Sequence, residues 1–370
     1  MGTEGSQKRG AAERVRFLPS FSSAFNEPGL RYAYIYLKAI LLTMAKSSGG
    51  SLISLFTGAG GLDYGFSLAG FKTVFAADYS KEAVDTFNKN LGDKVAIKLD
   101  LSKIKPVDFI KKLPAGEAPI GLIGGPPCQG FSRGNVFADA DDPRNTLPFR
   151  YATLLDALNK KFKLHFFVFE NVADLTGPKH IKRFNRIVNR LRKAGFNVFF
   201  EVLNAADYSV PQRRKRVFIV GLNNNLYPDA KFSFPPKIKK IKTVSDAIAH
   251  LPTPQFYKRG MMAEEIGYHP NHWTMMPKSA KLKNGLSSGR SFRRLEWNEI
   301  SPTVAYGNRE IHVHPDGGRR LSILEAMLLQ GFPESYKLTG NLSSQVTQVS
   351  NAVPPPMAKA IAKQLKEILV

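Results

Sequence analysis

The one cysteine of the 370-residue chain, Cys128, lies in the segment GGPPCQGFS (124–132). Two prolines before it force extended backbone, and a strand is predicted to end just ahead of them. A lone cysteine is usually a small buried apolar residue, but no core periodicity surrounds this one. A thiolate at the end of a strand is a nucleophile. The sequence therefore predicts nucleophilic chemistry at Cys128, and it excludes an internal disulfide and any multi-cysteine zinc site.

A carboxylate follows a second apolar run. Glu170 closes HFFVFE (165–170), where nearly every preceding residue is apolar. Burial disfavours the charged form, so we expect a raised pKa and a side chain that can act as an acid. The alternative is a structural carboxylate with satisfied hydrogen bonds.

A basic run, SVPQRRKRVFIVG (209–221), leads into a further predicted strand. Side chains at alternate positions of an extended chain share one face. That spacing places three polar side chains together, those of Gln212, Arg214 and Arg216. A plain basic turn is the alternative.

A glycine-rich turn, FTGAGGLDYG (56–65), follows the first predicted strand. Its glycines let the backbone approach a ligand closely as a helix begins; a tight turn without a ligand is the alternative. Asp78 ends the next strand, 20 residues beyond Gly58, where an acidic side chain would hold ribose hydroxyls. Asp100 ends the third strand at the same edge.

The third glycine of a dinucleotide-binding turn is replaced by Asp63. A carboxylate there would be a poor neighbour for a pyrophosphate. S-Adenosylmethionine carries a ribose and a positive charge but no phosphate, so the sequence favours this methyl donor over NAD.

Short apolar runs alternate with amphipathic segments, which predicts an α/β fold with a parallel sheet covered on both faces. We expect an antiparallel pair at 196–205 and 216–222 to close the sheet, and a proline-started helix from 354 to the end. The expected strands are 51–56, 72–78, 95–100, 121–125 and 165–170, and the expected helices 61–69, 81–90, 106–112, 149–160 and 179–194.

The chain carries a formal net charge of +23, and residues 179–242 hold 16 Lys and Arg against 3 Asp and Glu. Phosphate groups bind favourably to clustered cations of this kind, which indicates a nucleic-acid partner. No apolar run reaches the length of a membrane helix and no signal peptide is apparent, so we expect a cytoplasmic protein.

The glycine turn, PPCQGFS, ENV (170–172), the Q-x-R-x-R run and the blocks RRLSILEAMLLQGFP (319–333) and QVSNAVPPPMAKAIAKQL (348–365) stand in the order found in DNA (cytosine-5)-methyltransferases. The chain resembles this family, of the bacterial restriction-modification type, from about residue 51 to 369. The resemblance implies an S-adenosylmethionine-dependent (Rossmann-like) methyltransferase sheet with a small target-recognition domain.

The resemblance also implies a mechanism. The target cytosine of double-stranded DNA is flipped into the pocket, Cys128 attacks carbon 6, and protonated Glu170 donates to ring nitrogen 3. Arg214 and Arg216 contact the base and nearby backbone. Carbon 5 then receives a methyl group from S-adenosylmethionine, and loss of its proton with release of Cys128 restores the ring.

Further residues take roles by correspondence with the family. The implied cofactor-binding residues are Phe56, Gly58, Ala59, Gly60, Gly61, Asp78, Tyr79, Asp100, Leu101, Pro126, Asn351 and Val353. The implied DNA-binding residues are Gln129, Ser132, Gln212, Arg290, Arg293 and Arg309, with Gln129 filling the place of the flipped base.

The expected organisation has four parts: a basic N-terminal extension (1–48), a catalytic, cofactor-binding domain (49–222), a target-recognition region (223–310) and a closing segment returning to the catalytic domain (311–370). Two histidine pairs, at 269/272 and 312/314, lack cysteine or acidic partners in the sequence, so no metal is expected. We expect a monomer, with a cognate restriction endonuclease as a possible partner, in a bacterial or archaeal cell.

Two rivals remain open. A transfer-RNA cytosine-5 methyltransferase would share the fold but carries extra cysteines near its active site. A non-catalytic DNA-binding protein of the same fold would be expected to have lost Cys128, Glu170 or the glycine turn.

Overall fold

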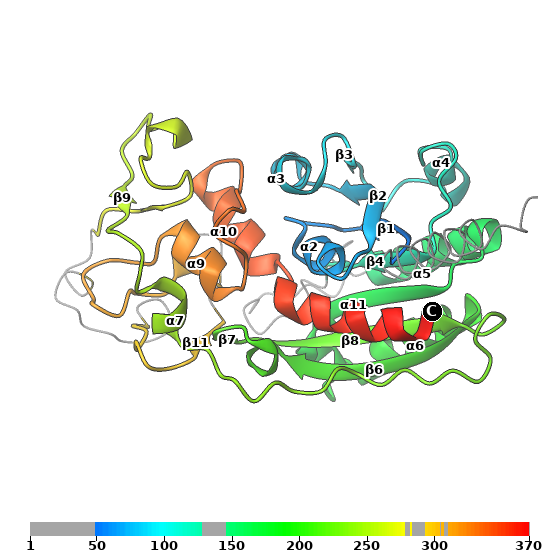
Figure 1. Cartoon of the computed structure of the whole chain (residues 1–370). Coiled ribbons are helices and arrows are strands. Elements are labelled where there is room, and N and C mark those ends of the chain that lie inside the picture. Colours follow the sequence, from blue (N-terminus) through cyan, green and yellow to red (C-terminus); the bar gives the residue numbers. More distant parts are fainter. Residues whose placement is uncertain are drawn as a thin grey trace, which may run out of the picture. The chain divides into compact units, whose positions relative to one another are not determined.

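A seven-stranded sheet forms the centre of the protein in this computed structural model, which describes residues 49–127, 146–277, 282, 293–303, 305–306 and 310–369 (Figure 1). The strand order is β3-β2-β1-β4-β5-β8-β6. Strands β1 to β5 run parallel, and β8 runs antiparallel to both β5 and β6, which confirms the expected closing pair. The strands are β1 (Ser51–Leu55), β2 (Lys72–Asp78), β3 (Ala96–Lys98), β4 (Gly121–Gly124), β5 (Phe166–Val172), β6 (Phe196–Asn204) and β8 (Lys215–Asn223).

Helices cover the sheet through two separate apolar clusters. Phe109, Leu155 and Ile187 belong to one cluster, which joins helices α4, α5 and α6 to the sheet. Phe66 and Ile361 belong to the other, which joins α2 and α11 to it. The helices are α2 (Gly61–Ser67), α3 (Lys81–Leu91), α4 (Pro106–Ile110), α5 (Leu147–Phe162), α6 (Ile181–Lys193) and α11 (Pro355–Leu369), with 3-10 turns η3 (Ala173–Thr176) and η4 (Ala205–Tyr208).

A third apolar cluster lies apart from the sheet. It combines Val244 and Trp273 with side chains from the closing blocks, among them Met327 and Val349. Thr243 caps its first helix with a reciprocal capping box. The elements here are α7 (Val244–Ile248), β9 (Gln255–Phe256), η5 (Ala263–Glu265), β10 (Trp273–Thr274), β11 (Ser301–Pro302), β12 (Ala305–Tyr306), β13 (Glu310–Ile311), α9 (Ile323–Leu329) and α10 (Leu342–Asn351).

The segment after residue 310 therefore contributes to two different apolar clusters. Its helices α9 and α10 pack in the third cluster with residues 244–297, and only α11 joins the cluster beneath β1. The third strand also ends earlier than expected, at Lys98. Asp100 lies beyond it in a turn, where its Oδ1 accepts from Ser102 N at 3.0 Å.

The parallel strands place their carboxyl ends at one edge of the sheet. Leu55 pairs with both Ala77 and Gly124, and Gly124 pairs with Phe169. The start of β8 reaches the same edge, where Arg216 lies opposite Val172. Ligands of open parallel sheets bind outside this edge. No helix in the described part of the chain is long and apolar enough to cross a bilayer.

Candidate active site

The glycine-rich turn leaves β1 through three left-handed backbone conformations, at Phe56 (φ 54°), Gly58 (φ 54°) and Gly60 (φ 78°). Gly58 N donates to Asp78 Oδ2 at 2.8 Å, so the carboxylate of β2 fixes the turn. A Cβ atom added at Gly58 would meet no atom of residues that the structure describes within 4 Å, whereas one at Gly61 would lie 2.3 Å from Val353 O. Gly58 thus faces open space and Gly61 faces the protein.

Asp63 points inward, and this corrects the sequence argument that set it beside a ligand. Its side chain is 1 % exposed. It accepts hydrogen bonds from the hydroxyls of Thr57 (2.8 Å), Thr73 (2.9 Å) and Ser54 (3.0 Å). Its role is to hold the turn against β1 and β2, so its presence does not argue for either cofactor. Burial raises the pKa of Asp63, and the three hydroxyls oppose that rise.

Asp63→Asn is expected to stay within about 1 kcal/mol of the wild type near neutral pH, because the hydroxyls can reorient towards the amide. Asp63→Ala leaves three buried hydroxyls without their acceptor and should cost about 3 kcal/mol. A raised folded-state pKa means that the folded protein binds more protons than the unfolded chain. The wild type therefore loses stability as the pH rises from the unfolded-state pKa of Asp63 through its folded-state pKa. The Asn variant should lack this slope in urea unfolding at pH ~5 and ~7.

The exposed Asp85→Asn is the matched control, since Asp85 pairs only with Lys81 on the surface of α3. It should change stability by less than about 0.5 kcal/mol. An unchanged pH slope in Asp63→Asn would contradict the account of Asp63.

Acidic and aromatic side chains surround the open side of the turn. The two Asp78 oxygens accept from the backbone of Gly58 and Ser80, and burial raises the pKa of Asp78. The ring of Tyr79 is 72 % exposed. Asp100 is half-buried and forms an ion pair with the exposed Lys103, at 3.6 Å. The edge is therefore suited to a ligand with hydroxyl groups, a ring and a positive charge.

The segment that carries the cysteine is anchored where it leaves β4. Asn171, the middle residue of ENV, donates from Nδ2 to Pro126 O at 2.9 Å and is 4 % exposed. Cys128 itself, with Gln129 and Ser132, lies outside the described residues. The role of Asn171 was missed in the sequence, although a polar residue directly after a buried run is the signal that could have found it.

Glu170 and Arg216 form a buried ion pair beside this segment. Arg216 Nε lies 3.0 Å from Glu170 Oε1, with side-chain exposures of 15 % and 8 %. A Cβ atom at Gly125 would lie 2.9 Å from Glu170 Oε2, so the glycine leaves room for that oxygen. Burial raises the pKa of Glu170, and the positive charges of Arg216 and Arg214 oppose this.

Arg214 lies deeper, with 1 % of its surface exposed. Its guanidinium donates to Ser350 O at 2.7 Å, and Ser350 precedes the exposed Asn351. Burial and the charge of Arg216 lower the pKa of Arg214, while Glu170 opposes this. Arg214 thus ties the strand that holds Arg216 to the end of α10.

The structure corrects the expected DNA contact of Gln212, because this side chain has no exposed surface. Its Nε2 donates to Gln330 Oε1 at 2.6 Å, and Gln330 Nε2 donates to Ala352 O at 2.6 Å. This buried chain of amides joins strand β7 (Gln212–Arg213) to the segment after α10. Gln330, a polar residue at the end of the apolar helix α9, is a second residue that the sequence did not single out.

Of the remaining expected DNA-binding residues, Arg290 and Arg309 lie outside the described part of the chain, and Arg293 is exposed. Among the histidines of the two pairs, His272 contacts Ser322 Oγ (3.0 Å) and Pro252 O (2.7 Å). His314 Nε2 lies 3.7 Å from Glu325 Oε1. These two rings are therefore part of the packing around α9.

Comparison with known proteins places this arrangement in a family. Residues 50–367 match the family described as C-5 cytosine-specific DNA methylase. The Type II methyltransferase M.MthTI of Methanothermobacter thermautotrophicus is 37% identical over 346 residues, covering 86% of this chain and 97% of that protein. M.FnuDI of Fusobacterium nucleatum, also a Type II methyltransferase, is 33% identical over 86% of this chain and 94% of its own.

Solved structures agree. A crystal structure described as a DNA modification methyltransferase encoded within a prophage (E. coli) superposes with a TM-score of 0.69 at 26% identity, covering 86% of this chain and 99% of that one. A variant of Spodoptera frugiperda DNMT2 gives a TM-score of 0.60 at 17% identity, covering 87% and 100%; this likeness shows the fold alone. The chain therefore belongs to the C-5 cytosine-specific DNA methylase family, and it is a DNA (cytosine-5)-methyltransferase that uses S-adenosylmethionine.

Proposed function

We propose that the methyltransferase acts through a covalent bond between Cys128 and the target base. The cytosine is flipped out of the duplex, and the Cys128 thiolate forms a bond to carbon 6 while ring nitrogen 3 takes a proton. Carbon 5 becomes nucleophilic and is methylated. The proton on carbon 5 then leaves, the bond between carbon 6 and sulfur breaks to release the thiolate, and nitrogen 3 returns its proton to Glu170. The observation that carries this proposal is the buried Glu170–Arg216 pair beside the segment Gly125–Pro126–Pro127 that precedes Cys128.

Glu170 is the proton donor in this proposal. A carboxyl group can give a proton to nitrogen 3 only while it is protonated, and burial raises its pKa in that direction. The oxygen that faces Gly125 is the one not engaged by Arg216. That oxygen is the one available to the base.

Three residues near Glu170 orient the groups that react. Arg216, which is partly exposed at the edge, contacts the base and holds the orientation of Glu170. Asn171 positions the backbone before Cys128 through Pro126 O. Arg214 is a positioning residue, because its guanidinium is buried and bonded to Ser350 O.

S-Adenosylmethionine fits the open side of the glycine turn. Open space beyond Gly58, the Asp78 carboxylate and the exposed Tyr79 ring match a ligand with a ribose and an adenine, and the carboxylates suit its positive charge. When bound, it supplies the methyl group that carbon 5 receives. We assign its binding to the turn, to residues at or just after the ends of β2, β3 and β4, and to the end of α10 with the segment that follows it. The residues are Phe56, Gly58, Asp78, Tyr79, Asp100, Leu101, Pro126, Asn351 and Val353. Ala59, Gly60 and Gly61 are buried and shape the turn from within.

Gly58→Ala is expected to raise the KM for S-adenosylmethionine at least about ten-fold, because the methyl group points into the open space and a non-glycine residue at φ 54° is strained by about 1 kcal/mol. The fold should survive, since the new Cβ meets no atom of the described residues within 4 Å. Steady-state methylation and thermal unfolding measure the two effects.

Gly61→Ala is the contrasting variant within the same turn. Its Cβ would collide with Val353 O, so it should lower stability by about 2 kcal/mol through displacement of the chain before α11. If Gly58→Ala left the KM for S-adenosylmethionine unchanged, the proposed cofactor position would be wrong.

Sequence recognition is assigned to residues 223–310. The region is tied to the site, because β11 pairs with β7 directly ahead of Arg214. Arg293 is exposed there, and an arginine fork matches the major-groove acceptors of guanine. We propose the same for Arg290 and Arg309. We further propose a cytoplasmic monomer, in a bacterial or archaeal cell, that protects the site of a cognate restriction endonuclease.

The test is transfer of labelled methyl groups from S-adenosylmethionine to unmethylated plasmid DNA, followed by base-resolution mapping of 5-methylcytosine. Modified cytosines within one short repeated sequence are expected. Label in transfer RNA but not in DNA would support the rival enzyme. No label in either would leave a DNA-binding protein.

A further inference from the structure

The helix that follows β5 has a strongly basic outer face that the catalytic chemistry does not use. Residues 179–193 contain seven Lys and Arg and no Asp or Glu. In α6 the apolar side chains, among them Phe184 and Ile187, are buried. The exposed side chains along the opposite face are Lys182, Arg186, Asn189, Arg190 and Lys193.

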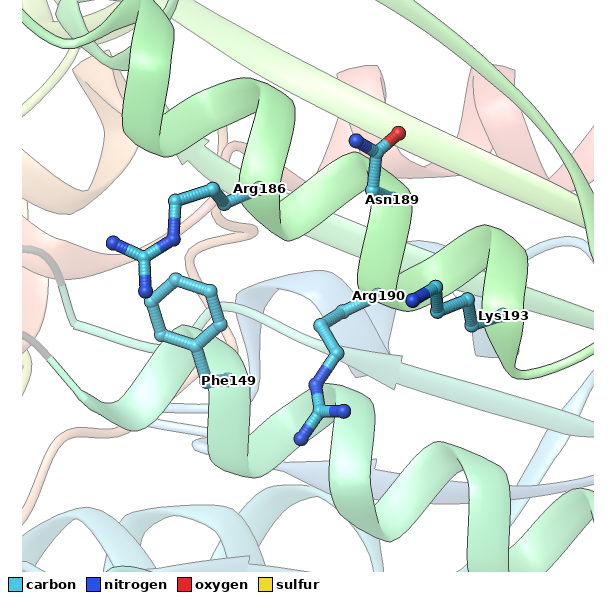
Figure 2. A pocket seen from close by; sticks show the side chains of 5 residues that line it. All are labelled: Phe149, Arg186, Asn189, Arg190 and Lys193. Carbon is cyan, nitrogen blue, oxygen red and sulfur yellow. The ribbon is translucent and has the colours of Figure 1, made fainter.

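Four of them, Arg186, Asn189, Arg190 and Lys193, border an open groove of about 410 Å³ between α5 and α6 (Figure 2). Phe149, in the first turn of α5, forms its other wall. The Arg186 guanidinium lies over the Phe149 ring, with 5.4 Å from Cζ to the ring centroid. The aromatic ring thereby holds one of the cations in place at the mouth of the groove, and the figure shows Arg190 and Lys193 following along the helix.

Within the described part of the chain, three cations of this face have no carboxylate partner. No carboxylate of the described residues lies within 4.0 Å of Arg186, Arg190 or Lys193. Arg186 and Arg190 are four residues apart, a spacing at which like charges destabilise a helix. The first turn contains Lys182 and no acid, although the helix dipole favours acids there. The repulsion between the two arginines and the cation in the first turn both disfavour the helix, and a bound polyanion would offset both effects.

The two helices that form the groove begin on the side of the catalytic edge of the sheet. Helix α6 follows Glu170 through η3, and Phe149 lies at the start of α5. From there the 13 residues of α6 extend about 20 Å, a length that matches about 6 base pairs of duplex DNA.

We propose that the α5–α6 groove binds the phosphate backbone of the DNA that flanks the target site, beyond the recognition sequence. The inference rests on DNA being the methylated substrate. Phosphates complement these cations, which pair with no carboxylate of the described residues.

The test compares Arg186→Gln/Arg190→Gln with Lys359→Gln/Lys363→Gln. Each pair is four residues apart on one helix, and glutamine keeps the helix propensity. The control pair lies on α11, which packs in the other apolar cluster. The substrates are duplexes centred on the site mapped on plasmid DNA, with about 3 or about 20 flanking base pairs on each side. KM for DNA, kcat and the salt dependence of binding are measured.

For the long duplex, the α6 variant should show a roughly ten-fold higher KM and a salt slope smaller by about 1.8, since two phosphate contacts are lost. Its kcat, its KM for the short duplex, and all values of the control should match the wild type. Equal loss on both duplexes, or no loss on either, would overturn the proposal. If the α6 variant differed from the wild type only in being inhibited less by added competitor RNA, the groove would be assigned to RNA instead. A wild-type enzyme that labels no DNA would overturn the proposed function itself.

Discussion

Cys128→Ala is expected to lower methyl transfer by about four orders of magnitude or more, while DNA binding is kept. Without the sulfur, carbon 6 receives no nucleophile and carbon 5 is never activated; a loss of this size corresponds to about 5.4 kcal/mol of transition-state stabilisation. Methylation of plasmid DNA is compared with duplex binding by fluorescence anisotropy. Because Cys128 is the one cysteine of the chain, no second thiol can replace it.

Cys128→Ser is the conservative companion. A serine hydroxyl has nearly the same shape but ionises far less readily than a thiol, so it should be almost as inactive as alanine. Activity equal to the wild type in either variant would contradict the covalent mechanism. Loss of DNA binding together with activity would assign Cys128 to the fold instead.

Glu170→Gln is expected to lower kcat by about 10²- to 10⁴-fold, because the amide keeps the shape of the side chain but has no acidic proton to donate. The wild-type rate should also fall as pH rises through the raised pKa of Glu170, where the carboxyl loses its proton. The Gln variant should lack this alkaline fall. A pH series of the single-turnover rate constant for methyl transfer, measured for both enzymes, tests both effects.

Glu325→Gln is a matched control, since Glu325 is also buried and pairs with an arginine, Arg319, at 2.8 Å. Glu325 lies on α9, whose apolar side chains pack in the third apolar cluster, so the substitution should cost stability and leave the pH profile of methyl transfer unchanged. A Glu170→Gln enzyme that kept the wild-type kcat would show that another group protonates the base.

The sequence predicted the site best where chemistry follows directly from the end of a strand. Asp78 and Glu170 follow apolar runs, and parallel strands bring their ends to one edge whatever the details of packing. The pKa direction of Glu170 was predictable for the same reason, since a carboxylate at the end of a buried strand is itself buried.

The orientation of individual polar side chains could not be predicted in this way. Asp63 turns inward because Thr57 and Thr73 offer hydroxyls beneath the turn. Gln212 is buried because Gln330, more than one hundred residues later, returns to meet it. Such contacts depend on how distant segments of the chain pack together, and the periodicity of a local stretch of sequence gives no information about that packing. The same holds for α9 and α10, which share their core with residues 244–297.

The covalent bond can be tested directly with a duplex in which 5-fluorocytosine replaces the target base. Fluorine cannot leave carbon 5 as a cation, so after methylation the bond between Cys128 and carbon 6 cannot be released. The account predicts a protein–DNA complex that survives denaturation, with the added mass on the peptide that contains Cys128. Methylation of ordinary DNA by the same preparation, without any such complex or with the mass on another residue, would contradict it.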